Sequence, residues 1–116
     1  MLLTTLDKRN EETIRQLVSL WNTVFGDGED YIRLIVPYLE AFDCYAVKYD
    51  GKIVSAFYLL PSEIKIGNNI FKGKYLYAAA TYEEYRKNGY MSSLIREAIN
   101  DNKNTSDFIS LVPADD

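Results

Sequence analysis

The sequence predicts a mixed α/β fold, with helices covering a sheet, built as a single domain over residues 1–116. Apolar residues recur first at helical spacing and then in three successive β-rich runs, after which a further helix and strand follow. The expected order is strand–helix–helix–strand–strand–strand–helix–strand. The three consecutive strands favour an antiparallel meander, whereas the last strand, reached through a helix, favours parallel pairing with the strand before it.

The first part of the chain predicts a short strand over residues 1–6 and then two helices. Asn10 is a favourable cap for the first helix, and Gly26 is a favourable stop. Residues 31–42 are largely apolar and predict the second helix. Pro37 lies inside it, and a proline removes a backbone hydrogen bond and clashes one turn back. We therefore expect a kink there, or two short helical pieces.

The middle of the chain changes to a strand pattern. Residues 44–49 and 53–60 are β-rich runs joined by Asp50 and Gly51, and this dipeptide is a strong hairpin signal. Tyrosine is abundant in the chain, with 10 copies. Tyrosine suits half-buried strand faces, so we interpret the excess as sheet packing.

Two irregularities are expected in the rest of the meander. The second run continues through residues 64–66 beyond Pro61, which predicts a bend or bulge rather than a central position in the sheet. After a turn at residues 67–69, residues 70–81 predict a long third strand, in which Gly73 marks a second irregularity.

The end of the chain predicts a helix beginning near Gly89, a polar loop over residues 100–107 and a short apolar strand over residues 108–112. The apolar stripe of this helix is Tyr90, Met91, Leu94, Ile95, Ala98 and Ile99. No strand follows residue 112, so the outer edge of the last strand would be open. We expect the natural domain to continue beyond it, with a further domain or a homo-oligomer as the other ways of covering that edge.

Composition excludes several classes of function. The net charge of −4 disfavours nucleic acid and anionic membrane surfaces as partners, and it favours a cationic second substrate such as an amine. With no histidine and only Cys44, the chain offers neither a histidine-ligated nor a cysteine-rich metal site, so we expect no metal. No signal peptide or membrane-spanning run is evident, so a cytoplasmic location is expected.

The most informative stretch is residues 76–95, an apolar strand that ends in small residues, then a basic turn, then an amphipathic helix. The first N–H groups of a helix have no partner within it, and the helix dipole places partial positive charge there. Arg86 and Lys87 lie just ahead of such a start, so the pattern indicates an anion site. An ordinary strand–loop–helix connection with solvated charges is the alternative.

A family resemblance strengthens the first interpretation. The run from Arg86 to Met91 resembles the acetyl-CoA signature of the GNAT N-acetyltransferase superfamily: Arg or Gln, two residues, Gly, one residue, then Gly or Ala. The element order matches that family from its first strand through its fifth, so the chain is similar to a GNAT domain truncated after the fifth strand. Met91 departs from the signature, because the family has Gly or Ala there.

The resemblance implies a binding site for acetyl-CoA as the acyl donor. Main-chain N–H groups of the signature would hold the pyrophosphate, and the pantetheine arm would lie between the fourth and fifth strands as these splay apart. The residues implied to contact acetyl-CoA are Ala79, Ala80, Thr81, Arg86, Lys87, Asn88, Gly89, Tyr90 and Met91. An N–H near Ala80 or Thr81 would face the thioester carbonyl. The small alanines equally fit a tight helix–sheet contact.

The implied reaction is acetyl transfer to an amine of a small molecule or peptide. It needs a base for the ammonium proton and an acid for the departing thiolate. Glu63, Glu83 and Glu84 are carboxylates near the predicted cleft, but solvated charges are the more common state of glutamate, so no catalytic residue is assigned. Two alternatives stay open: a non-catalytic module of this fold that senses acyl-CoA or binds a protein, and an unrelated α/β ligand-binding domain.

Overall fold

The computed structural model describes residues 2–5 and 10–111 of the chain. In chain order the elements are β1 (Leu2–Thr5), α1 (Glu11–Phe25), α2 (Glu29–Leu39), β2 (Asp43–Tyr49), β3 (Lys52–Ile66), β4 (Asn69–Thr81), the 3-10 helix η1 (Glu83–Tyr85), α3 (Tyr90–Asn102) and β5 (Phe108–Leu111). This order confirms the predicted one. The predicted ends of the first and last strands, at Met1, Leu6 and Val112, lie outside the described residues.

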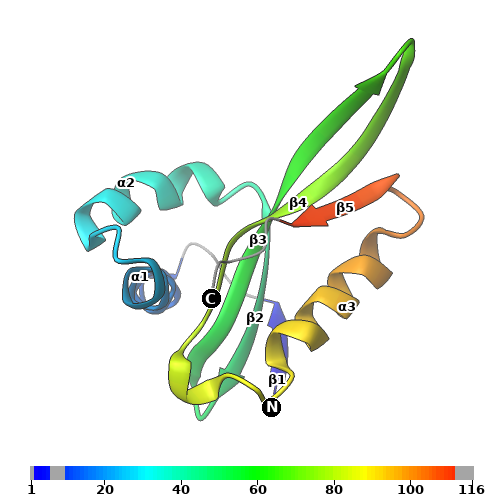
Figure 1. Ribbon diagram of the computed structural model, residues 1–116. Helices are drawn as coiled ribbons and strands as arrows, with labels where there is room; N and C mark the ends of the chain where they lie inside the picture. The colour runs from blue at the N-terminus through cyan, green and yellow to red at the C-terminus, as the bar shows by residue number, and fades with distance from the viewer. Residues whose placement is uncertain (1, 6–9, 112–116) are drawn as a thin grey trace.

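The strands form one five-stranded sheet in the order β1-β2-β3-β4-β5. The first four strands pair antiparallel, and β5 pairs parallel to β4, so the predicted α/β fold with a mixed sheet is confirmed. Helices α1 and α2 cover one face of the sheet and α3 covers the other (Figure 1). No helix in the described part of the chain is long and apolar enough to cross a membrane.

Strand β3 forms the centre of the core. Its first half, from Ile53 to Leu59, is buried at every residue because helices lie on both faces of the sheet. A strand covered on both sides is apolar at nearly every residue, as this one is apart from Ser55. The side chains that pack around it from the helices are Leu17, Val18, Leu20, Trp21, Ile32, Val36, Leu39, Leu94 and Ala98.

The ends of α1 form as the sequence predicts. The Asn10 side chain accepts hydrogen bonds from the N–H groups of Glu12, at 2.9 Å, and Thr13, at 3.2 Å. At the other end, Gly26 adopts the left-handed conformation with φ of 69°, and its N–H donates to the Asn22 carbonyl. These contacts satisfy backbone groups that a helix end otherwise leaves unpaired.

The second helix corrects one expectation. Helix α2 runs without interruption through Pro37 to Leu39, so of the two alternatives expected there, a kink or two short pieces, the second is excluded. Pro37 lies near the end of the helix, where only a short stretch remains to be disturbed. Apolar packing of Ile32, Val36 and Leu39 on the sheet keeps the helix intact around it.

The β3–β4 hairpin confirms that Pro61 avoids a central position in the sheet, and it corrects the irregularity expected at Gly73. Strand pairing continues regularly at Pro61, opposite Lys74, and at Gly73, opposite Ser62, so no bulge lies at either residue. Pro61 is tolerated because β2 ends its pairing at Leu59, which leaves β3 with a neighbour on one side only. Beyond this point the hairpin protrudes from the body of the molecule (Figure 1).

The last helix is longer than expected. Residues 100–102, predicted to be loop, form the final turn of α3. Asn102 is buried there, and its side-chain amide donates to the Ala98 carbonyl at 2.8 Å, which holds a polar residue in the helix. The apolar stripe of α3 faces the sheet at Leu94 and Ala98, whereas Ile99 is 48% exposed.

Asp107 binds the start of β5 to β4 through two hydrogen bonds. Its N–H donates to the Lys72 carbonyl, and its carboxylate accepts from the Lys72 N–H.

We predict that Gly73→Ala destabilises the fold. A Cβ atom at this position would lie 2.3 Å from the Phe108 carbonyl oxygen and 2.7 Å from its ring, so β5 must shift. Overpacking of this kind costs about 1–3 kcal/mol. Urea unfolding measures the loss, with Ser62→Ala on the facing strand as the control. Equal losses in the two variants would contradict the close approach of β5.

We also predict that Tyr58→Phe flattens the loss of stability at alkaline pH. Burial raises the pKa of the Tyr58 hydroxyl above its ordinary 10.0, so the folded protein keeps this proton while the unfolded chain releases it. The unfolded state binds fewer protons above that pH, and stability therefore falls as pH rises. Between pH 9 and 11 the variant should lose about 1 kcal/mol less than the parent in urea unfolding.

Tyr38→Phe is the matched control, because the Tyr38 side chain is 78% exposed. An alkaline loss in Tyr58→Phe as large as that of the parent, or larger, would refute the role of the buried hydroxyl.

Candidate functional site

Strand β4 carries a β-bulge near its end. Ala56 of β3 pairs with Ala80 and Tyr58 pairs with Tyr77, so Ala78 and Ala79 together face the single residue between them on β3. Ala78 has a φ of 55°, in the left-handed region that favours glycine. Bulges of this kind redirect backbone groups and are frequent beside active sites.

The sheet opens on the other side of the same segment. Parallel pairing of β4 with β5 reaches Leu76 opposite Leu111. Residues 77–81 of β4 continue past this point, and no described residue pairs with them on that side. This open edge presents backbone N–H and C=O groups that a ligand can bind.

The end of β4 is held by a set of cross-links. The Thr81 hydroxyl lies 2.8 Å from the hydroxyl of Ser55, a residue that is fully buried. The next residue, Tyr82, donates its N–H to the Val54 carbonyl, and its hydroxyl lies 3.0 Å from that of Ser19 on α1. The sheet and α1 therefore fix the position from which the following loop starts.

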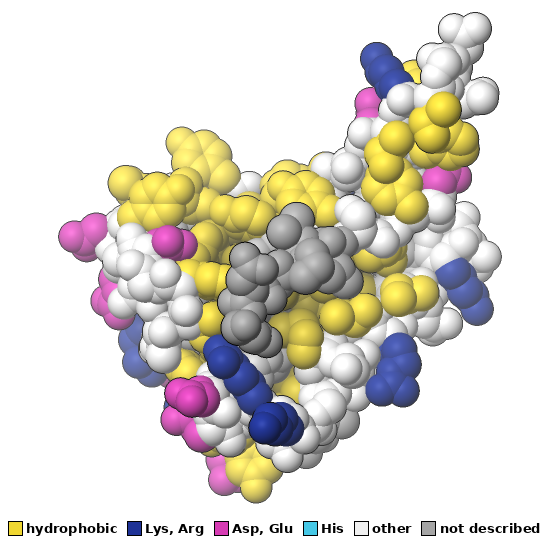
Figure 2. Space-filling model, in the orientation of Figure 1, with side chains coloured by type: hydrophobic (Ala, Val, Ile, Leu, Met, Phe, Trp, Pro, Cys, Tyr) yellow, Lys and Arg dark blue, Asp and Glu magenta, His cyan; other side chains and the backbone are white. Residues whose placement is uncertain are grey.

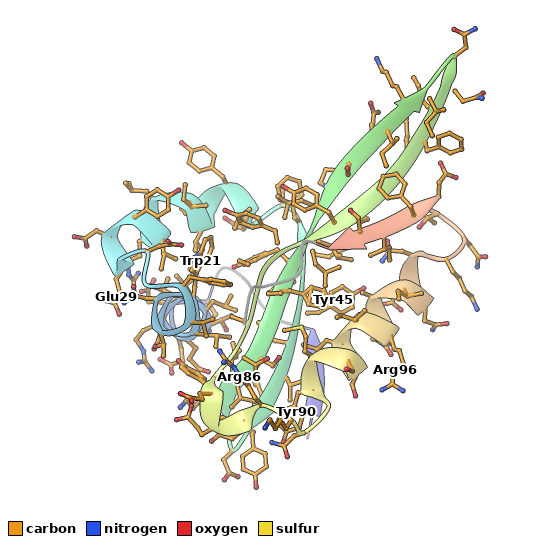
Figure 3. All side chains as sticks on the ribbon, viewed as in Figure 1. Trp21, Glu29, Tyr45, Arg86, Tyr90 and Arg96 are labelled. Atoms are coloured by element: carbon orange, nitrogen blue, oxygen red, sulfur yellow. The ribbon has the colours of Figure 1, made fainter. Side chains whose placement is uncertain are left out.

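The loop between β4 and α3 is stabilised by its own side chains. The Arg86 guanidinium donates from Nε to the Thr81 carbonyl at 3.1 Å, and the Asn88 amide donates to the Tyr85 carbonyl at 3.0 Å. Lys87 and Gly89 adopt left-handed conformations, with φ of 67° and 77°. Arg86 and Tyr90 mark the two ends of this turn in Figure 3.

The backbone N–H groups at the end of this loop and in the first turn of α3 have no acceptor among the described residues. Among the described residues, none accepts a hydrogen bond from the amides of residues 87–92, and the first amide bonded within α3 is that of Ser93, to the Gly89 carbonyl. A pocket of about 200 Å³ lies against them. Its lining residues are Thr81, Tyr85, Arg86, Lys87, Gly89, Tyr90, Met91 and Ser92.

The three helices of the described chain differ at their N-termini. The first turns of α1 and α2 contain two acidic residues each, and α1 also has the Asn10 cap. The first turn of α3 has no acidic residue, and its cap position, Gly89, has no side chain to satisfy the free amides. The partial positive charge of the helix dipole therefore remains uncompensated only at α3, beside the guanidinium of Arg86 and the ammonium of Lys87.

The structure brings together most of the residues implied by the GNAT signature. The members that line the pocket are Thr81, Arg86, Lys87, Gly89, Tyr90 and Met91. The Asn88 side chain turns back onto the loop, and Ala80 packs toward α1, where it lines a void of about 10 Å³ with Trp21. The helix–sheet contact considered for the alanines therefore applies to Ala80.

Tyr85 and Ser92 also line the pocket, although the signature does not single them out. Ser92 could have been found from helix geometry, because the amides of the whole first turn lack partners. Met91, the departure from the signature, is half-buried, packs against the core and also borders the pocket. Its side chain is therefore accommodated without closing the space over the amides.

The carboxylates considered as bases lie apart from this pocket or point to solvent. Glu63 is exposed on the protruding hairpin, and Glu83 and Glu84 are exposed on η1. None of them shares a hydrogen bond with another described side chain. Within the described part of the chain, no group of three His, Cys, Asp or Glu residues could hold a metal ion.

Comparison with known proteins gives one family. A profile of the acetyltransferase (GNAT) domain matches residues 5–115. No curated protein matches the chain. Among solved structures, a probable N-acyltransferase from Enterococcus faecalis, described as a conserved protein of unknown function, aligns with a TM-score of 0.78 at 16% identity. The alignment covers 98% of this chain but only 29% of that one, so the chain spans less than a third of its length.

Two aminoglycoside acetyltransferases have the same fold. The 6'-N-acetyltransferase from Acinetobacter haemolyticus aligns with a TM-score of 0.79 at 15% identity, over 100% of this chain and 81% of that one. An aminoglycoside N-acetyltransferase in complex with CoA aligns with a TM-score of 0.74 at 8% identity, over 97% and 76%. Because the domain profile matches nearly all of the chain, this protein belongs to the GNAT acetyltransferase family.

Proposed function

We propose that the chain transfers an acetyl group from acetyl-CoA to an amine. The observation that supports this most directly is the run of unpartnered amides at residues 87–92, which faces a pocket beside two cationic side chains. CoA carries a diphosphate, and diphosphates bind such amides at the start of a helix. The proposal treats residues 1–116 as one domain acting in the cytoplasm.

The residues present fit this cosubstrate. The amides of residues 87–92 offer donors to the diphosphate oxygens, and Arg86 and Lys87 add positive charge in a chain that is acidic as a whole. The open edge at residues 77–81 of β4 would bind the amide groups of the pantetheine arm as a strand partner does. Acetyl-CoA supplies the activated acyl group as a thioester.

The end of β4, beyond the bulge at Ala78, would contribute to the chemistry through the backbone. The Tyr82 N–H donates to the Val54 carbonyl, so by the alternation of the strand the Ala80 N–H would face β3 and the Thr81 N–H would face the edge that no described residue pairs with. A fixed N–H aimed at the acyl oxygen stabilises negative charge as the amine attacks. The base that takes the ammonium proton is not assigned to a residue.

A test of the cosubstrate site is Gly89→Asn. Asparagine tolerates the left-handed backbone at this position, and a Cβ atom there meets no atom within 4 Å, so the fold should be retained. Its side chain would project into open space at the pocket and obstruct the diphosphate. We expect CoA binding, measured by calorimetry, to weaken about tenfold, a loss of roughly 1.4 kcal/mol.

The matched control is Gly67→Asn, at a hairpin turn with φ of 61° and equally open surroundings. It should bind CoA like the parent. Equal affinities in the two variants would mean that the loop does not hold the diphosphate.

Turnover of acetyl-CoA distinguishes an N-acetyltransferase from a non-catalytic module that only binds acyl-CoA. We expect thiol release from acetyl-CoA to depend on an added amine, with a panel of polyamines, aminoglycosides and peptide amines as acceptors. Gly89→Asn should lower the rate at subsaturating acetyl-CoA and recover in part at saturation, because the change weakens binding. Binding of CoA without thiol release for any amine would favour the non-catalytic module of the same fold.

A further inference from the structure

An exposed apolar stripe runs along the outer face of α2. Tyr31, Leu34 and Tyr38 recur at the spacing that places side chains on one face of a helix, and they are 52%, 69% and 78% exposed. The opposite face of the same helix packs on the core. These three exposed residues are called the α2 stripe below. A contiguous apolar surface of this kind on a folded domain indicates an interaction site.

A second exposed apolar stripe lies on the protruding β3–β4 hairpin. Ile64 pairs directly with Phe71, so their side chains share one face of the hairpin, and Ile66 lies on that face two residues along. These three residues, called the hairpin stripe below, are 45%, 38% and 63% exposed in that order. The other face is charged, since Glu63 there pairs with Lys72. The hairpin therefore presents one apolar face and one charged face.

The two stripes belong to the same side of the sheet. Alternation along β4 places Tyr75 on the face of the hairpin stripe. The ring of Tyr75 meets that of Tyr77, which in turn meets the indole of Trp21 on α1. The hairpin stripe thus continues onto the face that α1 and α2 cover. Figure 2 shows hydrophobic side chains over α2 and along the hairpin in one view, and Figure 1 shows both elements at the same end of the molecule.

The charges beside the two stripes are opposite in sign. Residues 61–74 of the hairpin contain three lysines and one glutamate. Helix α2 begins with Glu29 and Asp30, and no described Lys or Arg forms an ion pair with either. Arg33, the cation of this helix, pairs with Glu11 of α1 at 3.1 Å. Electrostatic attraction therefore favours contact of a hairpin with α2, and repulsion disfavours contact of two hairpins or of two α2 helices.

A second copy of the chain supplies both complementary surfaces at once. In a two-fold dimer the hairpin of each protomer would lie on α2 of the other, and this symmetry closes without leaving a stripe over. The exposed parts of the six side chains amount to roughly 600–700 Å² per protomer, at about 200 Å² for a large apolar side chain. Complete burial in the dimer would remove about 1,300 Å² from water, which lies within the range of specific interfaces.

We propose that the chain forms a two-fold dimer in which the hairpin stripe of each protomer packs on the α2 stripe of its partner. The interface uses side-chain faces and leaves the outer edge of β5 free. It does not depend on the proposed function, because neither stripe lines the pocket beside the amides of residues 87–92.

Sedimentation velocity over the micromolar range tests the dimer. Leu34→Lys would bring an ammonium group against the basic hairpin of the partner, and Ile66→Glu would bring a carboxylate against the acidic start of its α2. Both side chains are largely exposed, so the fold should tolerate the changes. Each variant should dissociate at least about tenfold more readily, a loss of roughly 1.4 kcal/mol.

The matched control is Ile99→Lys, which replaces an apolar side chain of similar exposure on α3, on the other face of the sheet. It should associate like the parent. A parent that stays monomeric throughout the micromolar range would overturn the inference, and so would equal weakening by Ile99→Lys.

Mixing the two variants distinguishes this dimer from other arrangements. A protomer carrying Leu34→Lys keeps its hairpin, and one carrying Ile66→Glu keeps its α2, so the mixed dimer has one intact contact and one in which the new charges are opposite in sign. Association should therefore return toward that of the parent, which also shows that both variants are folded.

The other outcomes identify other occupants. Weakening by Ile66→Glu alone would indicate contact between hairpins, and weakening by Leu34→Lys alone would indicate contact between α2 helices. Either result, or a mixture no more associated than the separate variants, would overturn the reciprocal dimer.

Discussion

The candidate site depends on a difference between the two neighbours of β4: β3 pairs with the strand to its end, whereas described pairing with β5 stops at Leu76. Pairing with β3 continues to Thr81, where the buried Ser55 hydroxyl lies within hydrogen-bonding distance of the Thr81 hydroxyl, whereas pairing with β5 is described as far as Leu76. Residues 77–81 are thus positioned by β3, and no described residue pairs with their other side. If pairing with β3 also stopped at Leu76, residues 77–81 would be a loop without fixed hydrogen-bond donors. If pairing with β5 also continued to Thr81, the backbone of these residues would be fully paired within the sheet.

Backbone strain occurs both at the bulge of β4 and in the loop that follows the strand. Lys87 and Ala78 both adopt left-handed conformations without being glycine, which costs roughly 1 kcal/mol or more at each residue. The hydrogen bonds of Arg86 to the Thr81 carbonyl and of Asn88 to the Tyr85 carbonyl offset part of this. The amides of residues 87–92 have no acceptor among the described residues and can therefore bind a ligand.

The sequence predicts those features that depend on neighbouring residues. The Asp50-Gly51 turn, the Asn10 cap, the Gly26 stop and the start of α3 after Gly89 are all local, and all are confirmed. The bulge at Ala78, the regular pairing at Pro61 and the close packing of Phe108 on Gly73 depend on strands distant in the chain, so a local pattern does not reveal them. The interpretation of the tyrosine excess as sheet packing holds for half of the ten tyrosines: Tyr45, Tyr49, Tyr58, Tyr75 and Tyr77 lie in strands. Only the fold brings Tyr75 and Tyr77 together with Trp21.

The proposed cosubstrate site carries local positive charge in an acidic chain. Arg86 and Lys87 form no ion pair with a described carboxylate, and they lie beside the N-terminus of α3, where the helix dipole adds partial positive charge. Salt screens exposed charges over roughly 8 Å at physiological ionic strength, so carboxylates elsewhere on the surface contribute little at this loop. A protein with a net charge of −4 can therefore still offer an anionic cosubstrate favourable charge at this one place.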